Sequence, residues 1–238
     1  MRLLNRVIAA AFLAFAVPMA AHAQTSDAPA AAPPAETAQT PDAAPPAAAP
    51  AVDMAKLMAP QALPVKALGS TDAPVTIIEY ASLTCPHCGR FYRDTFPALK
   101  TKYIDTGKVQ FVMREFPLDQ LALVAAVVAR CGPEDKYFDI IETLFSTQDK
   151  WAFVENPAQA LFTAVAPYGI TEESLKACIA DETVVQGVIE ISQRGQELGV
   201  NGTPAFFING EMHGGEISIA ELDGILEPLL AGAATTAE

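Results

Sequence analysis

The sequence predicts an α/β fold in which a long helical segment interrupts a small sheet. A run of β-branched and apolar residues at 73–82 predicts a buried strand. A helical pattern follows at 86–104, and a second strand pattern follows at 108–117. Residues 118–199 carry helix signals throughout, and strand patterns return at 203–210. The predicted order is therefore β–α–β, a block of helices, and β–β–α.

Proline and glycine mark several boundaries of these elements. Pro86 suits the first position of a helix, where no backbone N–H is needed. Pro97 lies inside the same predicted helix, and we expect it to kink or split that helix. Asn209-Gly210 follows the strand pattern near the C-terminus and is a strong signal for a type I′ hairpin.

The helical segment shows several starts and ends. An apolar stripe with helical spacing ends at Gly132-Pro133, which predicts the end of one helix there. The stripe contains Val124, Val127, Val128 and Cys131. Further helix starts are predicted by capping signals at Asn156-Pro157, Thr171 and Asp181, and by a capping box formed by Ser218 and Glu221.

The chain divides into regions of different composition. Residues 1–23 have the features of a secretory signal: two arginines, an apolar stretch and the small-residue cleavage site AHA. An uncleaved anchor is the alternative, although the apolar stretch is shorter than the roughly 20 residues of a membrane span. Residues 24–60 are expected to be a disordered spacer, because alanine and proline dominate most of them. We expect a sheet domain built from 61–117 and 200–238, with a helical insertion at 118–199.

The net charge of the chain indicates which classes of binding partner are disfavoured. The formal charge of the whole chain is −13. Nucleic acids and anionic membranes both require basic patches on a binding protein. The charge therefore argues against nucleic acid or an anionic membrane as the main partner.

The four cysteines all follow the predicted signal, so export would place them in an oxidising compartment. Two of them form the motif CPHC, Cys85-Pro86-His87-Cys88, at the start of a predicted helix. Unsatisfied N–H groups at a helix N-terminus stabilise a thiolate, and His87 is expected to add a partly cationic donor. Cys85 is then the exposed attacking thiol, and Cys88, one turn further, the more buried resolving thiol.

CPHC has two alternative interpretations, a structural zinc site and a structural disulfide. A structural zinc site needs four ligands, but Cys131 and Cys178 lie 47 residues apart and form no second CxxC. After the signal only two histidines remain, His87 and His213. A purely structural disulfide within CPHC would close a tight, strained loop. Both interpretations are less favoured than a redox pair.

Cys131 and Cys178 lie on apolar faces of predicted helices, with no neighbouring charge in the sequence to activate them. In an oxidising compartment we expect them to form a structural disulfide that closes the helical segment. Two buried free thiols are the alternative.

The motif in its context resembles the DsbA-like family of secreted thiol-disulfide oxidoreductases. The resemblance rests on CPHC after VTIIEYASLT and on TPAFFING more than a hundred residues later, and it covers about residues 62–232. It implies an α/β thioredoxin fold with an all-helical insertion domain. It also implies that Cys85 is the nucleophile, that Glu79 is a buried acid that relays a proton near Cys88, and that Thr203-Pro204 is a cis-proline loop that faces the active-site sulfurs.

Two of these assignments have simple alternatives, and one residue, Thr203, departs from the pattern of the best-known members of the family. Glu79 would face solvent if its strand follows the usual alternation. Pro204 would be an ordinary trans proline at a strand start. Thr203 stands where the best-known oxidases of the family carry valine, and threonine there also occurs in isomerase relatives. Those relatives usually have a dimerisation domain, which residues 24–51 cannot form.

The sequence thus favours a periplasmic thiol-disulfide oxidoreductase that donates a Cys85–Cys88 disulfide to exported, cysteine-containing proteins. We expect a monomer that needs no organic cofactor or metal, and the resemblance implies a membrane quinone-linked oxidase as its re-oxidant. An isomerase or reductase of the same fold is the nearest alternative. A thiol-based metal-sequestering or chaperone-like binding protein is an alternative of another class.

Overall fold

A computed structural model describes residues 51–236 of the chain. The predicted signal and most of the predicted spacer lie outside the described residues. No helix in the described part is long and apolar enough to cross a membrane.

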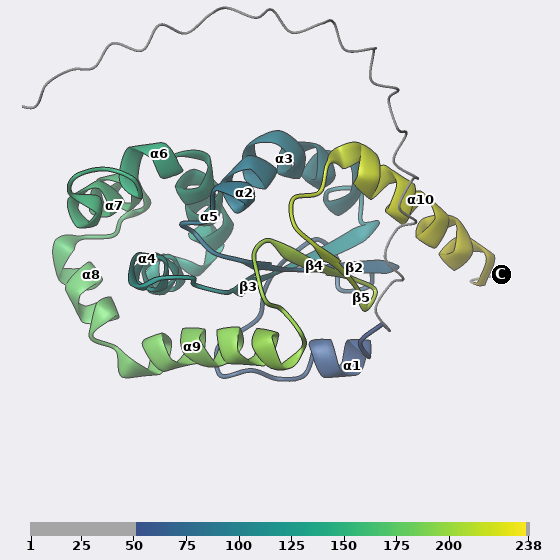
Figure 1. Cartoon of the computed structure of the whole chain (residues 1–238), viewed down its shortest axis with the longest axis horizontal. Coiled ribbons are helices and arrows are strands. Elements are labelled where there is room, and N and C mark those ends of the chain that lie inside the picture. The colour runs from purple at the N-terminus through teal and green to yellow at the C-terminus, as the bar shows by residue number, and fades with distance from the viewer. Residues whose placement is uncertain (1–50, 237–238) are drawn as a thin grey trace, which may run out of the picture. The chain divides into compact units, whose positions relative to one another are not determined.

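A five-stranded sheet with the order β1-β3-β2-β4-β5 forms the centre of the fold (Figure 1). The strands are β1 Lys66–Leu68, β2 Val75–Ala81, β3 Val109–Glu115, β4 Ala205–Ile208 and β5 Glu211–Gly214. The central pair β2 and β3 is parallel, and the other three pairs are antiparallel. The order β–α–β and then β–β–α is confirmed. This α/β arrangement is the thioredoxin fold that the resemblance implied.

The helix after CPHC runs from Pro86 to Ile104 without interruption but changes its hydrogen-bonding pattern. It consists of α2 (Pro86–Arg90), a π-helical turn η1 (Phe91–Thr95), α3 (Phe96–Leu99) and a second π-helical turn η2 (Lys100–Ile104). Pro97 stands in the first turn of α3, directly after the first π-helical turn. The helix is therefore subdivided near Pro97, because a proline nitrogen has no hydrogen to donate to the preceding turn.

Between β3 and β4 the described elements are all helices. They are α4 (Gln120–Cys131), η3 (Glu134–Lys136), α5 (Tyr137–Ser146), α6 (Gln148–Trp151), α7 (Pro157–Val165), η4 (Ala166–Tyr168), α8 (Glu172–Ile179) and α9 (Glu182–Glu197). Asn156, Thr171 and Asp181 each accept a hydrogen bond from the first turn of the helix that follows, as their residue types predicted. The last helix, α10 (Ile219–Thr236), follows the capping box of Ser218 and Glu221.

The sheet and the helical segment share one hydrophobic core. In Figure 1, α2, α3 and α10 cover one face of the sheet, and α1 and α9 lie on the other. Tyr92 of η1 stacks on Phe145 of α5, with ring centroids 4.2 Å apart, and both side chains are buried. Residues of the predicted insertion thus pack directly against the helix that follows CPHC. The division into a sheet domain and a helical insertion remains a prediction that rests on the order of the elements along the chain.

A buried ion pair joins β3 to the helical segment. Arg130 of α4 contacts both carboxylate oxygens of Glu115, and its Nη2 lies 2.7 Å from Oε2. The Tyr137 hydroxyl of α5 donates to Oε1 of the same carboxylate at 2.7 Å. These charge-assisted hydrogen bonds hold the pKa of Glu115 below its usual value although the carboxyl group is fully enclosed. Nothing in the local sequence indicates this pair, because a glutamate at the end of a strand carries no sign of its partner.

The predicted spacer extends too far toward the fold. Asp53 caps a short helix, α1 (Met54–Leu57), and Leu57 is fully buried against the sheet. The Val52 N–H donates to the carbonyl of Gly210 at 2.8 Å, at the β4–β5 hairpin. The spacer boundary at residue 60 is therefore wrong by several residues, because the apolar side chains of this stretch cover the second face of the sheet. Strand β1 was also missed, since three residues are too few to show an alternating pattern.

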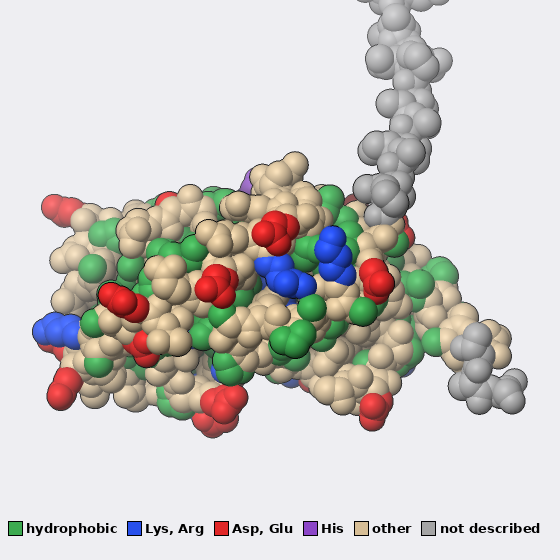
Figure 2. Space-filling model, turned by 90° about the horizontal axis from the view of Figure 1, so that it is seen from below, with side chains coloured by type: hydrophobic (Ala, Val, Ile, Leu, Met, Phe, Trp, Pro, Cys, Tyr) green, Lys and Arg blue, Asp and Glu red, His purple; other side chains and the backbone are tan. Residues whose placement is uncertain are grey.

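The face of the molecule that Figure 2 shows agrees with the acidic composition of the chain. Acidic side chains are scattered there among apolar and neutral ones, and the few basic side chains near the centre form no broad patch. This face of the described part therefore offers no extended basic surface for a polyanion.

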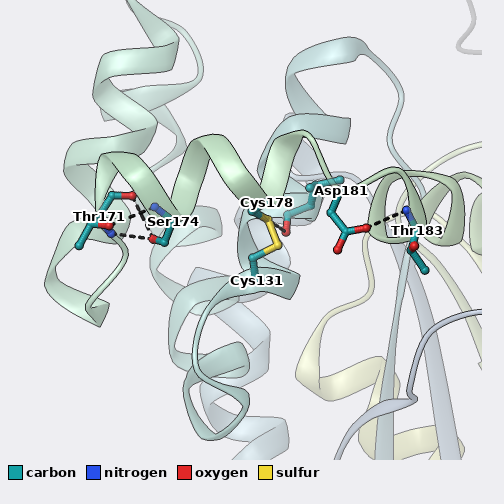
Figure 3. The surroundings of a disulfide bond; sticks show 7 residues. Cys131, Thr171, Ser174, Cys178, Asp181 and Thr183 are labelled. Atoms are coloured by element: carbon teal, nitrogen blue, oxygen red, sulfur yellow. Dashed lines mark hydrogen bonds between the residues drawn. A yellow bond between two sulfur atoms is a disulfide. The ribbon is translucent and has the colours of Figure 1, made fainter.

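Cys131, at the end of α4, and Cys178 of α8 form a disulfide (Figure 3), with their Cα atoms 5.9 Å apart. The bond closes a loop of the helical segment across a sequence separation of 47 residues. It lies beside the capped start of α9 and far in sequence from CPHC. Cys178 is buried and Cys131 is exposed at the end of its helix. Neither lies at the start of a helix, where a thiolate would be stabilised, so the bond is typical of a structural disulfide rather than an exchanging one.

We predict that replacing both Cys131 and Cys178 by alanine lowers the free energy of unfolding by at most about 4 kcal/mol, because the unfolded chain gains loop entropy. Urea unfolding of the wild-type and double-variant proteins, both oxidised, measures this loss. Alkylation of both thiols in native protein that has never been reduced would contradict the prediction.

Candidate active site

Cys85 lies where β2 passes, through a short turn, into α2. Its backbone is extended and occupies the N-cap position, and its carbonyl accepts the Gly89 N–H at 3.1 Å. Pro86 takes the first helical position, as predicted. The N–H groups of the first helical turn lie near the Cys85 sulfur and lower its pKa, although none forms a well-aligned capping hydrogen bond with it. The sulfur therefore lies at the N-terminal end of the helix, close to N–H groups that have no partner within the helix.

Several donors surround the Cys85 sulfur. A hydrogen bond from the Cys88 thiol is the largest cause that lowers the pKa of Cys85, and burial partly opposes it. The side chain of Thr203 and the backbone N–H groups of Cys88 and His87 lower the pKa further. Together they bring it from an ordinary value of 9.0 to about 5. At neutral pH the reduced protein therefore holds Cys85 as a thiolate.

Cys88 has the opposite character. Its side chain is fully buried, and burial is the largest cause that raises its pKa well above the ordinary value. Its hydrogen bond to Cys85 and the nearby Glu79 carboxyl raise the pKa further. The two cysteines are both free in the structure and differ sharply in acidity. Cys85 is itself buried, with 6% of its surface exposed, so the expectation of an exposed attacking sulfur is wrong: the Thr203-Pro204 loop packs against it. The two thiols differ in acidity far more than in burial.

The loop at Thr203-Pro204 lies against Cys85. The peptide bond between these two residues is cis, and the Cys85 sulfur lies 3.2 Å from the Thr203 carbonyl oxygen, to which it donates only in its protonated form. The Thr203 hydroxyl is buried close enough to Cys85 to lower the pKa of that thiol, although it forms no well-aligned hydrogen bond with a described residue. A groove of about 570 Å³ begins here, and its lining includes His87, Pro204 and Met212. Cys85 is not part of the lining, but it contacts Thr203, which is.

His87 contributes in a different way from the expected one. Its ring is largely exposed and is held by Arg90, whose Nη2 lies 2.6 Å from Nδ1, and Arg90 also pairs with Glu216 at 2.8 Å. The group of His87 that lowers the pKa of Cys85 is its backbone N–H. The expected contribution of the imidazole is thus replaced by that of the main chain.

Glu79 is fully buried in the middle of β2, so its solvent-facing alternative is wrong. Strand β2 is central and covered on both faces, which removes the usual alternation of exposed and buried residues. Neither carboxyl oxygen forms a hydrogen bond with a described residue. Burial is the main cause that raises the pKa of Glu79 to about 8, the nearby Tyr92 hydroxyl partly opposes it, and the charge of Cys85 adds to it.

Two positions at this site were missed by the sequence analysis. Gln148 of α6 reaches the turn before α2 and donates to the Cys85 carbonyl at 2.9 Å. Thr84, next to Cys85, donates to Asp119 at 2.6 Å. Neither residue stands in a motif, and each contact joins residues at least 35 positions apart, so nothing in the local sequence indicated them. Within the described residues no cluster of three or more histidine, cysteine or acidic side chains has a geometry that would hold a metal ion.

We predict that the reduced protein shows a thiolate transition with a midpoint near pH 5, measured by absorbance at 240 nm. Cys88→Ala should raise this midpoint, because it removes the strongest donor to Cys85. Cys85→Ser should abolish the transition. A wild-type midpoint above about 8 would show that Cys85 is an ordinary thiol.

Comparisons with known proteins agree with this geometry. A family model described as Thioredoxin matches residues 64–228. A curated Rickettsia bellii protein named "Putative protein-disulfide oxidoreductase" is 36% identical over 149 residues, which is 60% of this chain and 56% of that protein. "Disulfide bond formation protein D" of Bacillus subtilis is 29% identical over 69% of this chain and 77% of its own length. The chain therefore spans little more than half the length of the Rickettsia relative.

Solved structures extend the match to the fold. Wolbachia pipientis alpha-DsbA1 has a TM-score of 0.71 and 32% identity, over 77% of this chain and 98% of that one. Oxidised BdbD from Bacillus subtilis has a TM-score of 0.63 and 26% identity, over 69% and 92%. The chain belongs to the thioredoxin family, and its solved relatives are DsbA-like proteins.

Proposed function

We propose that the chain is a thiol-disulfide oxidoreductase that works outside the cytoplasm and donates the Cys85–Cys88 disulfide to other proteins. The observation that carries this proposal is the opposite acidity of two cysteines one helical turn apart. The names of the Rickettsia and Bacillus relatives support it. Residues 1–23 support export to the periplasm.

The proposed reaction moves two electrons from a substrate dithiol to the enzyme. A substrate thiolate attacks the Cys85 sulfur of the oxidised enzyme, the bond to Cys88 breaks, and Cys88 leaves as a thiolate that takes up a proton. The second substrate thiolate then attacks the mixed disulfide at the substrate sulfur. Cys85 leaves as a thiolate, and the substrate carries the new disulfide. A leaving thiol of low pKa departs faster, so the environment of Cys85 favours this second step.

The acidity of Cys85 also sets the direction that we propose. A thiolate that is stabilised only in the reduced native protein makes the disulfide form a stronger oxidant. A pKa lowered from 9.0 to about 5 stabilises the reduced native state by up to about 3 kcal/mol at pH 7 before solvent screening is counted. This contribution is complete above pH 9 and is lost as the pH falls through 5. It favours a donor of disulfides over a reductase.

Glu79 fits the role of a proton carrier for Cys88. When Cys88 leaves as a thiolate in the core, the proton that it takes up must come from a neighbouring group. Glu79 is buried, raises the pKa of Cys88 by its charge, and has a pKa of about 8 of its own. At neutral pH it is therefore protonated and able to donate. We propose that it supplies this proton and recovers it when the enzyme is re-oxidised.

The groove beside Thr203-Pro204 supports broad substrate use. Its lining in the described residues is mostly small or apolar and includes Val200, Gly202 and Ala205. An extended substrate segment would pair with backbone groups there rather than with selective side chains. We propose that the substrates are exported proteins with free cysteines and that a membrane quinone-linked oxidase restores the disulfide. Threonine at position 203 also occurs in isomerase relatives, so an isomerase or reductase of the same fold is the second candidate.

The direct test is an equilibrium of the purified protein with reduced and oxidised glutathione. We predict that Cys85 and Cys88 equilibrate as an oxidising couple, with a potential above that of the glutathione pool of the cytosol. The oxidised protein should also form disulfides in a reduced substrate, and Cys85→Ser should abolish this activity. A potential near that of thioredoxin, about −270 mV, would overturn the donor role and support a reductase.

For Glu79→Gln we predict a change in the pH dependence of stability. The wild-type carboxyl ionises near pH 4.5 when unfolded and near 8 when folded, so the native state loses stability as the pH rises between these values. At pH 7 this loss amounts to roughly 3 kcal/mol. Urea unfolding of both reduced proteins from pH 4 to 8 should show a smaller decline in the variant. Parallel curves would mean that Glu79 is not held neutral.

A further inference from the structure

Gln148 connects the helical segment to the turn that carries Cys85. It is the first residue of α6, and its side chain is only 3% exposed. Its amide nitrogen donates to the Leu83 carbonyl at 2.8 Å and to the Cys85 carbonyl at 2.9 Å. Both hydrogens of the amide nitrogen are therefore used on two carbonyls of one turn, 65 and 63 residues away.

These hydrogen bonds fix the turn at Cys85, the residue that carries the reactive sulfur. The Cys85 carbonyl also accepts the Gly89 N–H at 3.1 Å, the first hydrogen bond of α2. Both of its lone pairs are thus occupied, one by the helix and one by Gln148. A peptide group held on both sides cannot rotate without breaking a buried hydrogen bond. The direction of the N–H groups that follow it is set accordingly.

The oxygen of the same amide packs against α2. A Cβ placed on Gly89 would lie 2.2 Å from the Gln148 Oε1 and 2.8 Å from its Cδ. The backbone of α2 is therefore in close contact with the amide, and only glycine leaves room for it at this position. Gln148 thus holds the turn that leads into α2 by two hydrogen bonds and contacts α2 itself at Gly89.

We propose that Gln148 is a positioning residue: it holds the first turn of α2 so that the His87 and Cys88 N–H groups stay directed at the Cys85 sulfur. It touches neither sulfur and acts only through the backbone. The proposal rests on the proposed function, because the thiolate that these donors stabilise is the leaving group of disulfide donation. It also assigns a task at the active site to α6, a helix of the segment between β3 and β4.

The test uses Gln148→Met, which keeps the length of the side chain and removes both donors. Thiolate absorbance at 240 nm should show the Cys85 midpoint rising by about one pKa unit. The equilibrium constant with glutathione should change by roughly tenfold toward a weaker oxidant, since one unit corresponds to a factor of ten. Gln159→Met is the matched control, because Gln159 is exposed on α7 of the same segment, and it should leave both quantities unchanged.

Gly89→Ala gives an independent second variant. Its methyl group would displace the Gln148 amide, so it should raise the Cys85 midpoint much as Gln148→Met does. In a Gln148→Ala background, where the space is open, Gly89→Ala should have little further effect. Additive effects of the two substitutions would contradict the proposed contact.

The outcomes separate this proposal from the proposed function. If wild-type protein donates disulfides and Gln148→Met lowers only the unfolding midpoint of the oxidised form, Gln148 is merely structural and the proposal is wrong. If Gln148→Met shifts the thiolate midpoint while wild-type protein donates no disulfides, the positioning role stands and the proposed function fails.

Discussion

The stabilisation of a negative charge on Cys85 is the interaction on which the site depends. A lone cysteine at the end of a strand would be a protonated thiol at neutral pH. Here the Cys88 thiol, the Thr203 side chain and two backbone N–H groups converge on one sulfur. Each of these donors comes from a different structural constraint: the first turn of a helix, the loop before β4, and the spacing of CxxC. The fold therefore holds several weak donors around the Cys85 sulfur.

The same arrangement needs a second sulfur that is kept uncharged. Burial does this for Cys88, and the acid at Glu79 adds to it. A buried acid without a hydrogen-bonded partner destabilises a protein, because the charged form loses its hydration. Its presence in the central strand, in the middle of the sheet, is hard to explain by stability alone. The cost is consistent with a group that must gain and lose a proton where water does not reach.

Local patterns predicted most of the fold and the centre of the site, because those features are encoded within a few residues. CPHC with Pro86, the capping residues of the helical segment and the Asn209-Gly210 hairpin are of this kind. What the sequence concealed are contacts between distant positions. The burial of Leu57 in an apparent spacer and the place of Gln148 beside the Cys85 carbonyl both depend on which element packs against which. The burial of Glu79 was expected only from the resemblance to a family, since the pattern of its strand left a solvent-facing side chain open. No single-residue propensity carries that information.

The helical segment brings residues that are distant in the sequence to the site that the local CPHC motif marks. It enters after β3 and leaves before β4, so both of its ends lie near the strands that carry the site. Its core is continuous with that of the sheet through Tyr92 and Phe145. Under the proposed positioning role of Gln148, a change in the packing of α6 would reach the turn before α2 through the hydrogen bonds to the Leu83 and Cys85 carbonyls. The acidity of Cys85 would then depend on how α6 packs as well as on the CPHC motif.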